Sequence, residues 1–211
     1  MDVQGTEPNI PDKAAINLFT AAKTIKINLQ TKESETILVD WGDGGDPERI
    51  SSQAGILNQL SHTFTTSTPQ HEVKVYARTI SSIVSPLFSI LKLTYLDVSG
   101  ATSLEVLSLP YGNELLSVDL SANLELTSIN LSDCKLQSIT LPKDLSKLRS
   151  LQLTSNDIKS INLTGATKLE VLSMASNKLS SIDLTDCHQM KNLNLNLNGL
   201  TEIIGVHQLT Q

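Results

Sequence analysis

Apolar and polar residues follow a fixed order through the second half of the chain, in the pattern L-x-x-L-x-L-x-x-N-x-L. Five copies occur, beginning at Leu104, Leu126, Leu148, Leu169 and Met190. Successive copies are 21 or 22 residues apart. Cys134 replaces the asparagine in the second copy, and the first copy is weaker, with Gly112 at that position. A constant period over five copies predicts a solenoid, in which each repeat forms one coil and contacts only its neighbours.

Each repeat contains two short segments in which apolar and polar residues alternate, as in a half-buried strand. The strands of the repeated pattern are predicted at residues 106–110, 128–132, 150–154, 171–175 and 192–196. A second set is predicted between them, at 95–99, 117–121, 138–142, 160–164 and 181–185. Successive segments lie 10 to 12 residues apart, which leaves no room for a helix. The prediction is therefore a mainly β protein with about five coils of 21–22 residues and parallel sheets on both faces, after a degenerate half-turn at Ile80-x-x-Ile83.

The recurring asparagines Asn156, Asn177 and Asn198 stand where each coil bends away from its pattern strand. A side-chain amide can both donate to and accept from backbone groups, which lose their partners at such a bend. Leaving one of these groups buried and unpaired costs about 1–3 kcal/mol. These asparagines are therefore predicted to be structural.

The first 80 residues do not carry the repeat. Alternating apolar residues predict strands at 24–30, 36–40 and 71–76. A tight turn is predicted at 41–47, because its Asp-Gly dipeptide suits the positive φ values of a hairpin loop. A short helix capped by Ser51 or Ser52 is predicted to extend to Leu60.

Residues 12–23 fit two structures. Asp12 could cap a short helix through Leu18, whereas the alternation of Ile16, Leu18 and Thr20 also fits a strand. Residues 1–12 contain two prolines and a glycine and are interpreted as a leader. The predicted division is a leader with a first strand or helix at 1–23, a small β domain at 24–78 and the solenoid at 79–211.

The small β domain resembles the PKD domain, an immunoglobulin-like β-sandwich of extracellular proteins. The resemblance is carried by Trp41-Gly42-Asp43-Gly44, by His62-Thr63-Phe64 and by Val73-x-Val75. The chain departs from that family in an insert between Pro47 and Leu60, and in Phe64, where a tyrosine is usual.

The repeats resemble leucine-rich repeats, and their pairing with a PKD-like segment is similar to bacterial surface proteins of the Bacteroidetes type, BspA-like and internalin-like. The resemblance implies an exported protein that is extracellular or anchored at the outer membrane, often through a lipid after signal cleavage. The anchoring cysteine is not in this sequence.

Composition narrows the classes of partner. Only 3% of residues are aromatic, which suits a core of stacked aliphatic ladders. The net charge of −6 argues against nucleic acid or anionic lipid as a ligand, because either needs a basic face. No apolar run approaches the roughly 20 residues that span a bilayer, and the first residues do not have the pattern of a signal peptide. Cys134 and Cys187 are predicted to be buried thiols too far apart to form a disulfide.

No catalytic constellation is found, so neither an enzyme activity nor a cofactor is predicted. The histidines His62, His71, His188 and His207 are scattered without zinc-site spacing. Asp40, Asp43 and Asp46 are interpreted as parts of a bare turn, with a calcium site as the alternative. Outward positions of the second strand set carry a row interpreted as a solvated face, with cation or basic-partner binding as the alternative: Asp97, Asp119, Thr140, Asn162 and Asp183.

The candidate binding surface is the exposed face of the pattern strands, because repeat proteins bind partners on such extended sheets. Its central positions are Ser108, Asn130, Gln152, Ser173 and Asn194. The predicted function is non-enzymatic adhesion to host protein or extracellular matrix. The alternatives are a spacer or assembly module of a surface complex, and a glycan-binding protein.

The last coil, after Ile203-Ile-Gly-Val206, has no convincing polar cap in the sequence. An exposed coil end offers unpaired strand edges. The sequence therefore predicts either a covering tail or end-to-end dimerisation through this coil.

Overall fold

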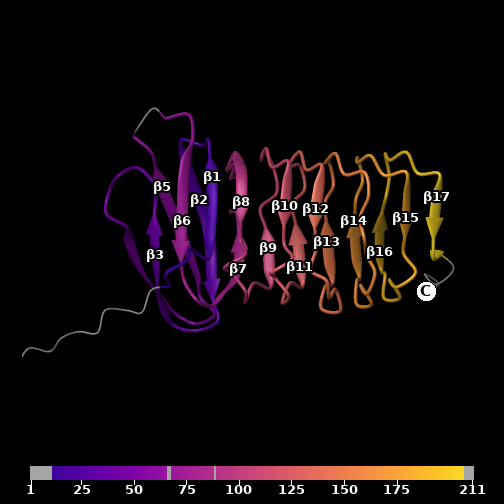
Figure 1. The fold of residues 1–211 in the computed structure, drawn as a ribbon, viewed down its shortest axis with the longest axis horizontal. Helices are drawn as coiled ribbons and strands as arrows, with labels where there is room; N and C mark the ends of the chain where they lie inside the picture. The colour runs from indigo at the N-terminus through magenta and orange to yellow at the C-terminus, as the bar shows by residue number, and fades with distance from the viewer. Residues whose placement is uncertain (1–10, 66–67, 88, 207–211) are drawn as a thin grey trace, which may run out of the picture.

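The computed structural model describes residues 11–65, 68–87 and 89–206 of the chain. The protein is mainly β with almost no helix. It is elongated, with the N-terminal strands at one end and a stack of coils extending from them (Figure 1). Most of the predicted leader at 1–12 lies outside the described residues.

The N-terminal part contains six strands: β1 (Ile16–Thr20), β2 (Thr24–Thr31), β3 (Glu35–Asp40), β4 (Glu48–Ser52), β5 (Leu57–Thr63) and β6 (His71–Tyr76). The coils contribute β7 (Ile80–Val84), β8 (Leu93–Asp97), β9 (Val106–Ser108), β10 (Ser117–Asp119), β11 (Ser128–Asn130), β12 (Ser138–Thr140), β13 (Ser150–Gln152), β14 (Val171–Ser173), β15 (Ser181–Asp183), β16 (Asn192–Asn194) and β17 (Glu202–Ile204).

Two sheets run from the N-terminal part into the coils. The long sheet has eight strands in the order β16-β14-β13-β11-β9-β7-β2-β5, and a five-stranded sheet has the order β4-β3-β6-β1-β8. In the long sheet, β7 pairs antiparallel with β2 and parallel with β9. In the five-stranded sheet, β8 pairs antiparallel with β1. The predicted boundary at residue 79 therefore lies between strands that share one sheet.

The solenoid is confirmed, with about six turns rather than the five predicted. The additional turn begins at β7, which was predicted as a degenerate half-turn. Its Ile83 is 1% exposed and pairs in register with Leu107 of β9. The pattern strands are shorter than predicted, at three residues each from β9 onward.

The second face of the coils is not the continuous sheet that the sequence predicts. Parallel pairing joins β10 to β12 and β15 to β17, and residues 160–164 form no strand. The break after β12 coincides with Pro142, which has no backbone N–H to donate, and with the longest spacing between successive strand segments, 12 residues from Ser138 to Ser150. We call this side, formed by β8, β10, β12, residues 160–164, β15 and β17, the broken face.

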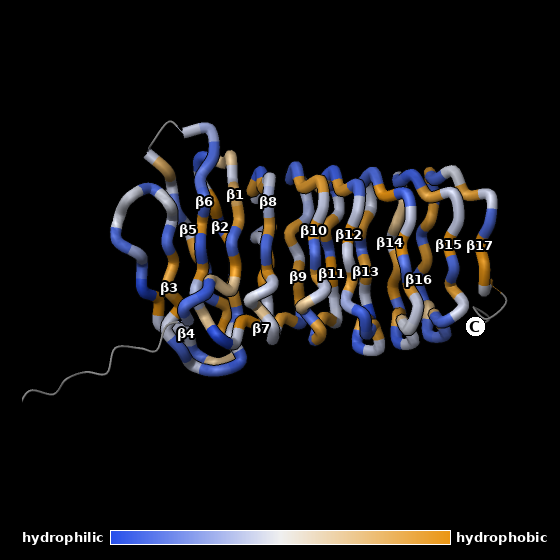
Figure 2. The backbone as a smooth tube through the Cα atoms, viewed as in Figure 1, coloured by the Kyte–Doolittle hydropathy of each residue, from blue (hydrophilic) through white to orange (hydrophobic). Residues whose placement is uncertain are grey.

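One hydrophobic core extends from the N-terminal strands through the coils. Its inward leucines and isoleucines stack in register, so that Leu107, Ile129, Leu151 and Leu172 are fully buried. Hydrophobic segments recur in every coil along the stack (Figure 2). In the last coil the equivalent Leu193 is 38% exposed, since no further described coil covers it.

The asparagine ladder lies at the bend, as predicted. The side chain of Asn156 accepts hydrogen bonds from the backbone N–H groups of Cys134 and Leu136, at 3.1 and 2.9 Å. It donates to the carbonyl oxygens of Leu131 and Leu153, at 2.9 and 3.0 Å. Each asparagine thus ties its own coil to the one before it.

The sequence missed one member of this ladder. Asn113, not Gly112, occupies the position in the first copy: it accepts from Leu93 N–H at 2.9 Å and donates to the Leu109 carbonyl at 2.8 Å. The copy is one residue longer here, and Tyr111 and Gly112 both adopt positive φ, at 74° and 67°.

The structure decides two predictions about secondary structure in the N-terminal part. Residues 16–20 form strand β1, not a helix, because they pair with β6 on one side and β8 on the other. The predicted helix from Ser51 or Ser52 to Leu60 is wrong, since β4 ends at Ser52 and β5 begins at Leu57. Pairing of β5 with β2 over seven residues outweighs the local preference, and Gly55, at φ 72°, makes the turn between β4 and β5.

Both cysteines are buried free thiols, as predicted. Burial raises the pKa of Cys134 and of Cys187 to about 11, which keeps them protonated near neutral pH.

Candidate functional site

The five predicted binding residues lie in one row on the outer face of the long sheet. Asn130 pairs in register with Ser108 on one side and with Gln152 on the other. Gln152 is opposite Ser173, which in turn is opposite Asn194. The structure therefore brings together all five side chains that the sequence singled out.

The row continues into the N-terminal part, where the sequence analysis predicts no binding residues. Ser108 is opposite Val84 of β7, Val84 is opposite Asn28 of β2, and Asn28 is opposite Gln59 of β5. The alternation of residues 25–29 places Asn28 outward, but its place in the row depends on the antiparallel pairing of β2 with β7. The surface therefore spans all eight strands, and we call these eight residues the polar row: Gln59, Asn28, Val84, Ser108, Asn130, Gln152, Ser173 and Asn194.

Several row side chains are held by local hydrogen bonds. Asn130 accepts from the Ser132 N–H and Asn194 accepts from the Asn196 N–H, both at 3.2 Å. The Ser173 hydroxyl lies 2.9 Å from that of its neighbour Thr154. These contacts fix the surface before any ligand arrives, which lowers the entropic cost of binding.

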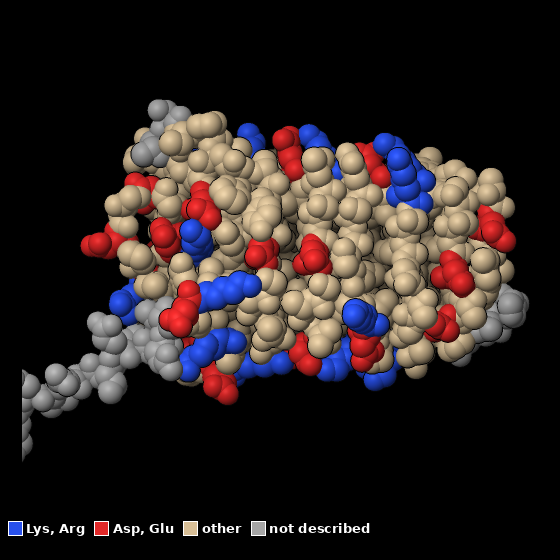
Figure 3. All heavy atoms as spheres, in the orientation of Figure 1, with Lys and Arg blue, Asp and Glu red and all other residues tan. Residues whose placement is uncertain are grey.

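The strands of the long sheet contain no phenylalanine, tyrosine or tryptophan, and charged side chains are confined mainly to its borders. Next to the pattern strands, Glu170 forms ion pairs with Arg149 and Lys191, at 3.0 and 2.8 Å. Lys32 and Glu105 pair at 2.6 Å beside β9. On the face drawn in Figure 3, charged side chains gather along the upper and lower borders of the coil stack, and some acidic side chains also lie in its middle. The polar row is therefore a flat, neutral surface.

The Trp41–Pro47 turn is held together by its own side chains. The Trp41 ring stacks on His62, with ring centroids 4.8 Å apart, and His62 Nε2 lies 2.9 Å from Asp43 Oδ2. The hydrogen bond from the Gly45 backbone N–H is the largest cause of the lowered pKa of Asp43. The hydrogen bond with His62 lowers this pKa further. Asp40 accepts from the Gly42 N–H at 2.9 Å. These carboxylates stabilise the turn, and among the described residues no group of three or more acidic, histidine or cysteine side chains could hold a metal ion.

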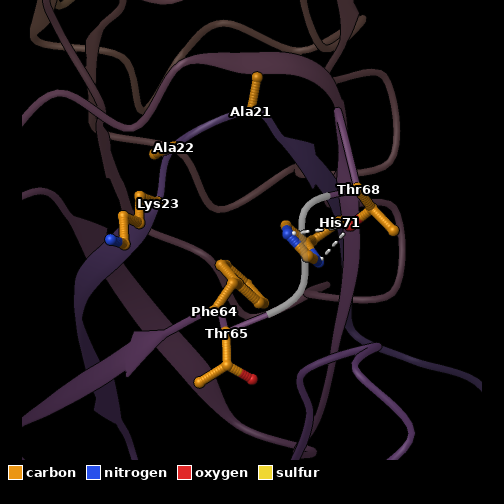
Figure 4. A pocket seen from close by; sticks show the side chains of 7 residues that line it. All are labelled: Ala21, Ala22, Lys23, Phe64, Thr65, Thr68 and His71. Atoms are coloured by element: carbon orange, nitrogen blue, oxygen red, sulfur yellow. Dashed lines mark hydrogen bonds between the residues drawn. The ribbon is translucent and has the colours of Figure 1, made fainter.

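A cavity of about 360 Å³ opens beside His71 at one end of the N-terminal part (Figure 4). The His71 ring stacks on Phe64 with centroids 3.7 Å apart, and both ring nitrogens lie 3.1–3.2 Å from the Thr68 hydroxyl. The ring is therefore already packed and hydrogen-bonded. His207 lies outside the described residues, and His71 is the one histidine among the described residues that line this cavity.

The outward row of the broken face has a structural role. Asp97, Asp119, Asn162 and Asp183 each accept a hydrogen bond from the backbone N–H two residues later, at 2.8 to 3.0 Å. This is the Asx turn that ends each segment of this face. Thr140 has no such bond among the described residues and is followed instead by Leu141-Pro142. Turn formation thus accounts for the recurrence of these side chains.

The last described coil is open. Leu197 is 80% exposed, and Ile203 and Ile204 are 40% and 44% exposed. In the described residues, β16 and β17 each pair with a strand on one side only. The coil end is thus apolar and uncovered within the described part, and end-to-end dimerisation stays a prediction.

No protein-family model, curated protein or solved structure matches this chain. Fold and site therefore define its class by themselves: a β-solenoid whose sheets continue into an N-terminal cap. No helix within residues 11–65, 68–87 and 89–206 is long and apolar enough to cross a membrane.

Proposed function

We propose that this protein is a non-enzymatic binding module that adheres to a host protein or to extracellular matrix through the polar row. The observation that carries the proposal is the uninterrupted register of the row across eight strands. A stack of equivalent positions presents the same chemistry many times at strand spacing, which suits an extended partner. The proposal assigns no catalytic residue and no cofactor.

A protein ligand fits this surface better than a sugar does. Sugars are usually held against an aromatic ring, and the strands of the long sheet have none. Except at Val84, the row offers amides and hydroxyls, which can pair with the polar groups of a protein surface. Without tryptophan, tyrosine or arginine anchors, each contact is weak, so adhesion depends on many copies acting together.

We also propose the finer family assignment: leucine-rich-repeat coils capped by a PKD-like domain, in a bacterial surface protein that is exported and anchored outside the cell. The stacked Trp41 and His62 rings beside the turn at Gly42–Gly44 support the PKD-like assignment. The buried asparagine at each bend supports the leucine-rich-repeat assignment. If the polar row binds no ligand, a role as a spacer or assembly module of a surface complex is favoured over adhesion.

The test is adhesion of beads that carry many copies of the whole chain to immobilised fibronectin, type I collagen and laminin. We expect retention on at least one of these proteins. Changing Gln152 and Ser173 together to arginine should reduce retention by about tenfold or more, because two bulky charges disrupt a flat neutral surface. A tenfold loss of affinity corresponds to about 1.4 kcal/mol of binding free energy.

The matched control changes Ser138 and Thr140 together to arginine, which places the same two charges at exposed positions of the broken face. It should retain wild-type adhesion. Absence of retention on all three proteins, or equal losses in the control and the double variant, would contradict the proposed function.

A further inference from the structure

The broken face contains a groove between β8 and β10. A hydrogen bond from Glu114 N–H to the Leu93 carbonyl, at 2.7 Å, joins the two rungs where β8 begins. Beyond it, no backbone hydrogen bond in the described residues joins residues 94–97 to β10, which belongs to a different sheet. The space between the rungs is about 360 Å³. That volume falls within the range of about 300–1,000 Å³ that small-molecule sites occupy.

An aromatic ring lines one side of this groove. Tyr95 is 45% exposed, although it lies on a strand at the centre of the molecule. Its ring contacts the edge of Phe19 on the adjacent strand, with centroids 5.4 Å apart and planes at 69°. The contact fixes the tyrosine ring, which leaves part of it free to pack against an apolar surface of a ligand.

Oriented carboxylates complete the lining. Asp97 and Asp119 each use Oδ1 to accept a backbone N–H, from Ser99 and Ser121, at 2.8 and 2.9 Å. The second oxygen of Asp97 has no partner among the described residues, whereas the Asp119 carboxylate also accepts from the Ser121 hydroxyl. The bond from the Ser121 N–H, followed by the bond from this hydroxyl, lowers the pKa of Asp119. The hydroxyl of Ser117 adds a group that can donate or accept.

We propose that this groove binds a neutral saccharide. A sugar ring has an apolar face, which would pack on Tyr95, and vicinal hydroxyls, which would donate to Asp97 and Asp119. The two carboxylates would repel sialylated or sulfated sugars. A cation is disfavoured, because the described residues contain no group of three acidic, histidine or cysteine side chains. The groove is on the opposite side from the polar row, so this site is independent of the proposed protein adhesion.

The experiment is a titration of the ¹⁵N-labelled whole chain with cellohexaose, xylohexaose, mannohexaose and N-acetylchitohexaose, followed by amide chemical shifts. We expect saturable shifts at residues 95–99 and 117–122 with at least one of the four. Tyr95→Ala should weaken that binding by about tenfold or more, and Tyr95→Phe should retain it.

Two further variants change exposed residues that line the groove. Asp119→Asn keeps an oxygen for the Ser121 N–H, as Asn162 does at the same place in another coil, but removes the charge, and should weaken binding severalfold. Ala122→Arg fills the groove from an exposed position and should abolish binding. The proposal is overturned if none of the four sugars shifts these amides, if calcium chloride alone does so, or if Tyr95→Ala and Ala122→Arg bind as wild type.

Discussion

Asn177→Ala is expected to lower the free energy of unfolding by about 3 kcal/mol or more. The Asn177 side chain accepts from the Ile158 N–H at 3.0 Å and donates to the carbonyl oxygens of Leu153 and Met174, at 2.8 and 3.1 Å. Alanine would leave three backbone groups without these partners at a position only 8% exposed. Each buried unpaired group costs about 1–3 kcal/mol.

Guanidinium denaturation followed by circular dichroism measures this loss. The matched control is Asn162→Ala, because Asn162 is exposed and bonds a single N–H, that of Thr164, at 3.0 Å. The control should lose about 1 kcal/mol or less, as is usual for surface substitutions. Similar losses at Asn177 and Asn162 would show that the ladder does not hold the coils together.

Leu172→Ala is expected to destabilise the N-terminal part as well as the coil that contains it. Leu172 is fully buried, and truncation of such a leucine costs about 2–5 kcal/mol. Trp41, the only tryptophan, lies in the N-terminal part and reports on it by fluorescence. Since β7 bonds both to β2 and to β9, the two parts share sheets and core and should unfold together.

The measurement compares the denaturation midpoint from Trp41 fluorescence with the midpoint from circular dichroism of the whole chain. The two should coincide in the wild type and fall together in Leu172→Ala. The chain contains two independent units instead if the fluorescence midpoint is unchanged while the circular dichroism midpoint falls.

The inward leucines and the bend asparagines were predictable because each is set by one coil alone. The pattern strands at 106–110, 128–132 and 150–154 were located correctly because side chains alternate in every strand. Asn113 was missed because one extra residue in its copy shifted the position, and sequence alone does not show which residues take positive φ.

What depends on contacts between distant segments was not predictable. The break between β12 and residues 160–164 coincides with Pro142 and the longest segment spacing, but the repeat does not show that pairing between these neighbouring coils is lost there. The local pattern of residues 51–60 predicts a helix, because the pairing of β5 with β2 does not show in that pattern. The groove beside Tyr95 lies along the free edge of β8, which pairs with β1 on its other edge, another long-range contact.

The candidate site likewise has one part that the sequence predicts and one part that it does not. Its five positions in the coils follow from the repeat, and the structure places them in one row. The extension through Val84 and Asn28 to Gln59 arises only when the antiparallel N-terminal strands join the parallel ones. With this extension, the binding surface includes strands of the N-terminal part as well as strands of the coils.

Asn28→Arg tests the central claim most directly, because Asn28 belongs to the N-terminal part and lies in the polar row. The measurement is the adhesion of multivalent beads to fibronectin, collagen or laminin, whichever of them retains the wild type. Ser51→Arg is the control, at an exposed position in β4 of the five-stranded sheet. One continuous binding surface predicts that Asn28→Arg loses adhesion by about tenfold, as the Gln152 and Ser173 double variant does, while Ser51→Arg retains it. Wild-type adhesion of Asn28→Arg would contradict the account.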